Sequence, residues 1–220
     1  MKSEKEILLK HLGPVLETER GNEYSAYRGA LNDARLVTGR SLEDGSLMPD
    51  YPCKPPIVIW LGALGYIALL DQIGACFKPS HKPRIEKGNS ISKALKYFTG
   101  LSDAEIDAIY ALRCSFAHDY GLSNIKKNKD KSIDTSLTHR FQVNARNDMP
   151  LVSFPTEPWD GVYTNKKPEN VTKISLFLLC ELVEGICAQL LALAESGNLD
   201  VELDKGYDEL ERRYGFYSGK

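Results

Sequence analysis

The chain has 220 residues, of which 42% are hydrophobic and 26% are charged, and its 28 basic and 30 acidic side chains give a formal net charge of -2. This composition excludes disordered, collagen-like and coiled-coil proteins and is typical of a globular domain with a hydrophobic core. The balance of charges also excludes a general attraction to nucleic acid or anionic membranes. Any phosphate binding would therefore require a local cluster of basic residues.

The N-terminal segment carries a helix-start signal. Ser3 and Glu6 have the spacing of a capping box, in which each side chain accepts a hydrogen bond from the other residue's backbone N–H. Gly13 and the proline that follows it cannot continue a helix. We therefore predict a helix over residues 4–12.

The next segments predict a second helix, a loop and a buried helix. Asn22 is a suitable N-cap for a helix over 22–38, and four prolines make 39–56 an irregular connection. A run of 14 residues without charge opens the segment 57–77. Because a bilayer span needs about 20 apolar residues, we predict a buried core helix and keep a membrane helix as the alternative. Gly62 and Gly65 would let a neighbouring helix approach closely.

Two further helices are predicted before the middle of the chain. A short helix within 89–100 would begin at Asn89 or Ser90. Ser102 and Glu105 form a second capping box, which opens an amphipathic helix.

The segment 123–169 differs from the rest of the chain because it is polar and contains two β-like runs, at 137–145 and 151–154. A turn sequence between the runs predicts a β-hairpin inserted between helices. A long apolar helix is expected over 171–196, followed by a weak helix near 208–214.

These elements together predict the fold class. We expect an all-α, up-and-down helical bundle with a small β-hairpin insertion. Residues 1–220 would form one domain, with the inserted loop and hairpin at about 123–169.

Cysteine and histidine usage bears on the compartment and on metals. Five cysteines are widely spaced without a CxxC pair, and they are Cys53, Cys76, Cys114, Cys180 and Cys187. The opening residues are charged and do not resemble a secretory signal. We therefore predict a reducing, cytoplasmic location without membrane insertion. The four histidines lack metal-ligand spacing, so we expect no metal.

The strongest functional signal is the motif Arg113-x4-His118-x-Tyr120 near the end of a predicted helix. Arginine binds phosphate oxygens through two parallel N–H groups, and histidine transfers protons near neutral pH. On an ideal helix, positions 113 and 118 are about 140° apart. Either the helix loosens before Gly121, or the two residues meet at a seam with another helix or another subunit.

This motif resembles that of the HEPN superfamily, and its longer form resembles HEPN toxins paired with minimal nucleotidyltransferase antitoxins. The resemblance implies a cytoplasmic homodimer that cleaves RNA in a toxin–antitoxin or phage-defence role. It implies that the RNA 2′-hydroxyl attacks the adjacent phosphate without a metal or cofactor. Arg113 and His118 would be catalytic, Ser115 and Asp119 would support them, and Tyr120 would be adenylylated by the antitoxin.

The chain departs from the family pattern at Cys114, where a polar Asn or Asp often follows the arginine. A residue that could orient the arginine is then missing, which keeps a second interpretation open. In that interpretation the chain is a non-catalytic HEPN-like module that binds RNA, nucleotide or a protein partner. In a third, purely structural interpretation, Arg113, His118 and Tyr120 would only cap the helix and pair with carboxylates such as Asp119 or Asp107.

A lysine cluster follows the motif and consists of Lys126, Lys127, Lys129 and Lys131. We interpret it either as an RNA-backbone contact or as a solvated loop. The nearby aromatic residues Phe154, Trp159 and Tyr163 would stack on unpaired bases or pack on the domain.

Overall fold

The computed structural model describes residues 3–19, 21–48, 57–119 and 121–219. It is a mixed α/β protein in which 49% of the residues are helical and 15% lie in strands. The prediction of an all-α bundle was therefore wrong. The strands are only two to six residues long, and most of their pairings join segments about 15 or more residues apart, so they leave no clear periodic signal in the sequence.

The helices of the described ranges follow the predicted order. They are α1 (Glu4–Leu12), α2 (Ala26–Val37), α3 (Ile57–Cys76), α4 (Ser90–Phe98), α5 (Asp103–Asp119), the 3-10 helix η1 (Pro168–Asn170), α6 (Leu176–Ser196) and α7 (Gly206–Tyr214). The capping box that opens α1 is confirmed, with Ser3 N–H donating to Glu6 Oε2 over 2.7 Å and Glu6 N–H to Ser3 Oγ over 3.2 Å. The capping box therefore sets the N-terminal boundary of α1.

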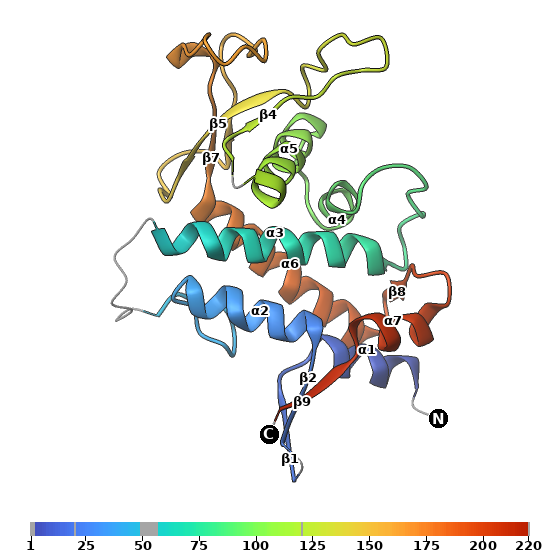
Figure 1. Ribbon diagram of the computed structural model, residues 1–220. Coiled ribbons are helices and arrows are strands. Elements are labelled where there is room, and N and C mark those ends of the chain that lie inside the picture. The colour runs from blue at the N-terminus through green and yellow to red at the C-terminus, as the bar shows by residue number, and fades with distance from the viewer. Residues whose placement is uncertain (1–2, 20, 49–56, 120, 220) are drawn as a thin grey trace.

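The strands form three small sheets. Their bounds are β1 (Leu16–Thr18), β2 (Gly21–Ser25), β3 (Phe77–Pro79), β4 (Ser123–Asn124), β5 (His139–Asn144), β6 (Val152–Ser153), β7 (Thr172–Ser175), β8 (Leu199–Val201) and β9 (Phe216–Gly219). The strand orders are β1-β2-β9, β3-β8 and β4-β5-β7-β6. Figure 1 shows the first of these sheets and the β4-β5-β7-β6 sheet at opposite ends of the molecule.

The second helix begins later than predicted. Its N-cap is Ser25, whose side chain accepts a hydrogen bond from the Arg28 N–H, whereas Asn22 lies in β2. Strand β2 pairs with β9 from the other end of the chain, with Asn22 opposite Gly219. This long-range pairing places residues 21–25 in a sheet and delays the helix.

The predicted hairpin is also wrong. Strands β5 and β6 do not pair with each other, because β7 lies between them, parallel to β5 and antiparallel to β6. The long apolar helix therefore begins at Leu176, after the N-cap Ser175, instead of at residue 171. Residues 123–175 accordingly form one unit, called here the β-rich region, which stands beyond α5 in Figure 1.

Helix α3 is the centre of the helical part, in contact with α2, α4, α5 and α6 (Figure 1). The predicted buried core helix is confirmed, and Ile67 and Leu70 are fully buried. The two glycines act as expected: an added Cβ at Gly62 would lie 2.2 Å from Thr38 Cγ2, and one at Gly65 would lie 3.2 Å from Ala34 Cβ. Small residues therefore set the spacing between α2 and α3.

Helix α6 is the second core helix, packed against α1 and α3. By length and composition alone it could cross a membrane, and 44% of its most apolar window is buried inside the protein. Cys180 and Cys187 on this helix are buried, and burial raises the pKa of each thiol to about 12. These cysteines therefore behave as small core residues.

Candidate functional site

The candidate motif lies in the second half of α5. The predicted capping box starts this helix, with Glu105 N–H donating to Ser102 Oγ over 3.3 Å and Ser102 N–H to Glu105 Oε2 over 2.9 Å. The helix remains regular through Asp119, so it does not loosen before the histidine position. Positions 113 and 118 are therefore about 140° apart around the helix axis.

Arg113 is held by a carboxylate from another helix. Its Nε donates to Oδ2 of Asp71 on α3 over 2.8 Å, and its Nη2 forms an ion pair with the same oxygen at 2.7 Å. The two side chains are each 31% exposed. Burial lowers the pKa of Arg113, but the charge and hydrogen bonds of Asp71 outweigh this effect and raise it. The guanidinium is thus both fixed in direction and accessible to solvent.

Asp71 supplies the orienting group that Cys114 lacks. The Cys114 side chain instead interacts with Tyr110, and this hydrogen bond, followed by burial, raises the pKa of the phenol. Sequence reasoning missed Asp71, which is 42 residues from Arg113. The available signal was a single carboxylate directly after the 14-residue run without charge, since a charge in such a helix usually has a partner.

The remaining motif residues are only partly described. His118 and Asp119 occupy the last two positions of α5, but their side chains, like Tyr120, lie outside the described part. Ser115 is buried, and its Oγ lies 2.5 Å from the Gly121 carbonyl oxygen and 3.1 Å from that of Ser123. Its hydroxyl therefore ties down the turn that leaves α5.

The four predicted lysines, Lys126, Lys127, Lys129 and Lys131, are all exposed on the turn between β4 and β5. A β-bridge between Lys127 and Ile133 closes this turn. The whole β-rich region holds nine basic and six acidic residues, a net charge of +3, which leaves -5 for the rest of the chain. The near-neutral net charge of the chain is therefore the sum of a basic β-rich region and an acidic remainder.

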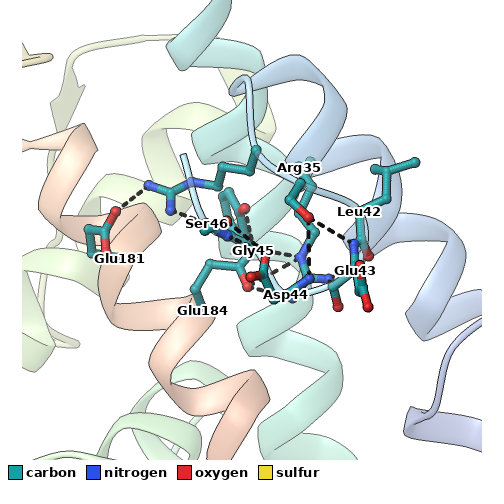
Figure 2. Close-up of polar contacts among 12 residues, drawn as sticks. Arg35, Leu42, Glu43, Asp44, Gly45, Ser46, Glu181 and Glu184 are labelled. Atoms are coloured by element: carbon teal, nitrogen blue, oxygen red, sulfur yellow. Dashed lines mark hydrogen bonds and ion pairs between the residues drawn. The ribbon is translucent and has the colours of Figure 1, made fainter. Parts of the chain in front are cut away.

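A second arginine–carboxylate pair lies in the core. Arg35 Nε donates to Glu184 Oε1 over 2.9 Å and Nη2 to Oε2 over 2.7 Å, with side-chain exposures of only 7% and 9%. The remaining nitrogen, Nη1, donates to the carbonyl of Leu42 over 2.8 Å, and Tyr66 OH donates to Glu184 Oε1 over 2.5 Å. Figure 2 shows how this cluster joins α6 to the loop after α2.

The same loop is fixed by a second arginine. Arg40 Nη1 donates to the Gly45 carbonyl over 3.0 Å, and Nη2 donates to Glu181 Oε1 over 2.6 Å. Gly45 has φ +77°, and an added Cβ would lie 2.3 Å from Glu184 Oε2. Every one of these groups is committed to holding the loop, so the cluster has a structural role.

No cluster of three or more potential metal ligands (His, Cys, Asp or Glu) occurs in the described part of the chain. Comparisons of the chain with protein-family models, with curated proteins and with solved structures give no match. The features of the chain that bear on function are therefore the motif and the geometry around Arg113.

Proposed function

We propose that the chain is a metal-independent endoribonuclease that acts as a homodimer through Arg113 and His118. One observation carries the proposal: an arginine of the motif is one-third exposed and is aligned by Asp71 instead of being enclosed in the core. The motif residues lie at the end of α5, directly before a region with a net positive charge. These features suit an anionic substrate.

The chemistry follows from the two residue types. The RNA 2′-oxygen would form a bond to the adjacent phosphorus while the bond from phosphorus to the 5′-oxygen breaks, which yields a 2′,3′-cyclic phosphate. His118 would take the proton of the 2′-hydroxyl or return a proton to the leaving oxygen. Arg113 would stabilise the extra negative charge on the phosphate oxygens, and Asp71 would keep its fork in position.

Two copies of the chain are expected at each site. Because α5 is regular through residue 119, its positions 113 and 118 do not face the same point. In a symmetric dimer, Arg113 of one protomer can face His118 of the other, and the symmetry makes two such sites. The helix geometry thus supports the homodimer that the motif implies.

The direct test is cleavage of single-stranded RNA in the presence of EDTA. Wild-type protein should cut the RNA and leave 2′,3′-cyclic ends, whereas Arg113→Ala and His118→Ala should each reduce the rate by about a thousandfold or more. Arg212→Ala is the matched control, because Arg212 is an exposed arginine on α7, outside the motif. Cleavage by both motif variants at the wild-type rate would remove the catalytic assignment.

A second candidate function is favoured by the charge of the β-rich region. Its net +3 would suit a non-catalytic module that binds RNA. Such a module would bind the same RNA without cutting it, and Arg113→Ala would leave that binding unchanged.

Regulation by a nucleotidyltransferase antitoxin belongs to the same proposal. The nucleotidyltransferase would transfer AMP from ATP to the hydroxyl of Tyr120, which follows the end of α5 in sequence, with release of pyrophosphate. The added bulk and charge would block the site. Coexpression with such an enzyme, followed by mass spectrometry of the peptide that contains Tyr120, tests this. An unmodified peptide together with undiminished RNA cleavage would contradict it.

A further inference from the structure

A pocket of about 300 Å³ lies between the start of α5 and the β-rich region. Buried side chains form its walls, namely Thr138, His139, Trp159 and Thr172. Exposed residues such as Ala104 and Phe154 form its rim, so the pocket opens to solvent. None of its lining residues in the described part of the chain belongs to the Arg113 motif.

The walls of the pocket are uncharged and fixed. Because a carbonyl oxygen only accepts, His139 Nε2 must donate to the Ser136 carbonyl at 2.8 Å, and Nδ1 then accepts from Thr172 Oγ1 at 2.9 Å. Burial also lowers the pKa of His139, which favours this neutral form. Trp159 Nε1 donates to the Val162 carbonyl over 3.2 Å. The pocket therefore offers flat rings and hydroxyl groups without a formal charge.

Aromatic groups are exposed beside the pocket. Phe154 on the rim is 46% exposed, and Tyr163 is 61% exposed with its ring centroid 5.7 Å from that of Trp159. Both exposed rings thus lie near the buried Trp159, Phe154 as a lining residue of the same pocket and Tyr163 by ring contact. Their rings suit a planar ligand, since aromatic side chains stack on such ligands.

The lysine turn begins at the wall of this pocket. The backbone N–H of Lys126 donates to Thr138 Oγ1 over 3.0 Å, and Thr138 is a buried wall residue. A ligand with its ring in the pocket would thus lie near Lys126, the first of the four exposed lysines. Rings and negative charges occur together in nucleotides, and single-stranded nucleic acids are bound by this combination of stacking and basic contacts.

We propose that the pocket between α5 and the β-rich region binds one nucleobase of single-stranded RNA, while Lys126 and its neighbouring lysines contact the phosphates. This inference shares with the proposed function only the assumption that RNA is the ligand. Ala104 and Arg113 are nine positions apart on α5, which places them on opposite faces and about 13 Å apart along the axis. The pocket is therefore a binding subsite on the face opposite Arg113, and position 118 lies about 21 Å from Ala104 along the axis.

The test measures binding of fluorescein-labelled oligonucleotides by anisotropy. One probe is a short 2′-O-methyl RNA, which cannot be cleaved because its 2′-oxygen is blocked, and the other has the same backbone without bases. Wild-type protein should bind the base-bearing probe at least about tenfold more tightly than the abasic probe, since a stacked base contributes this much. Ala104→Phe, which fills the pocket from its rim, and Phe154→Ala should each remove the preference and leave abasic binding unchanged.

The lysines are tested separately with a charge-matched control. Replacing Lys126, Lys127, Lys129 and Lys131 by glutamine should weaken binding of both probes. The affinity of this variant should also depend less on salt concentration than that of wild-type protein. The control replaces four exposed basic residues of the helical part, Lys5, Lys87, Lys205 and Arg212, by glutamine and should retain binding. A wild-type protein without a preference for bases would overturn the pocket assignment. Equal loss of binding in both quadruple variants would overturn the lysine contact.

The outcomes also separate this inference from the proposed function. If the pocket variants lose base preference while wild-type protein never cleaves RNA, the subsite stands and the endoribonuclease fails. If cleavage depends on Arg113 but the pocket variants bind both probes as wild-type protein does, the subsite fails alone.

Discussion

The two arginine–carboxylate pairs of this protein use the same groups for different purposes. The Arg35–Glu184 pair is less than 10% exposed, and Arg35 and its partner also bond Leu42 and Tyr66. The Arg113–Asp71 pair is 31% exposed on both sides and uses one carboxylate oxygen. The comparison teaches that the surroundings of an arginine, more than its pairing, distinguish a structural residue from a candidate catalytic one.

The largest effect is expected at the buried pair. Glu184→Ala leaves the Arg35 guanidinium buried without its counter-charge, which should lower the free energy of unfolding by about 3–5 kcal/mol. Urea denaturation measures this change. Asp71→Asn is the control, at the more exposed Arg113–Asp71 pair. A loss below about 1 kcal/mol for Glu184→Ala would contradict the structural role.

Acid should destabilise the helical part through His11. Burial lowers the pKa of this imidazole from 6.5 to about 4, and its ring packs against Tyr27 and Phe77. The folded state therefore keeps His11 neutral, while the unfolded chain takes up a proton below pH 6.5. The contribution of His11 to the free energy of unfolding is fully present above pH 6.5. It should decrease by roughly 3 kcal/mol as the pH falls toward 4.

Replacement of the imidazole isolates this contribution. The unfolding free energy of His11→Phe should fall less between pH 6.5 and pH 4 than that of wild-type protein, because a phenyl ring does not titrate. Equal pH dependence of the two proteins would show that other groups dominate.

A smaller effect is expected at the loop that covers the buried pair. Gly45→Ala places a Cβ at 2.3 Å from Glu184 Oε2 and forces a side chain into φ +77°. The left-handed backbone and the close contact should together cost about 2 kcal/mol in thermal unfolding. Gly197→Ala is the matched control, since its φ is +72° and an added Cβ would meet nothing within 4 Å. A loss at Gly197 as large as that at Gly45 would contradict the contact with Glu184.

The smallest effect on stability is expected at the more exposed Arg113–Asp71 pair. Asp71→Asn should change the free energy of unfolding by less than about 1 kcal/mol, because solvent screens this pair. The same change should slow RNA cleavage by about 10–100-fold, since the guanidinium loses the carboxylate that aligns it. Unchanged cleavage by Asp71→Asn would show that Arg113 does not need this partner.

The sequence predicts those parts of the fold that depend on local chemistry. Capping boxes at Ser3 and Ser102 place the starts of α1 and α5, and Gly197 ends α6 in the left-handed conformation. Prediction from the sequence fails for strands whose partners are distant along the chain. Residues 172–175 resemble the start of the apolar helix that follows, and only the contact with β5, about 30 residues away, makes them a strand.

The candidate site shows the same division. Arg113 and the lysine turn are visible as a motif and a charge cluster, because their members are close in sequence. Asp71 and Glu184 lie 42 and 149 residues from the arginines they pair with. Which arginine is buried and which is exposed is therefore a property of the packing of α3 and α6, and no local pattern reports it.

Mixing two inactive variants shows whether each site takes one residue from each protomer. If each site combines Arg113 of one protomer with His118 of the other, a dimer of Arg113→Ala with His118→Ala contains one intact site. An equimolar mixture after subunit exchange should then recover about a quarter of the wild-type RNA cleavage in EDTA. A mixture that stays as inactive as each variant alone would contradict the shared site.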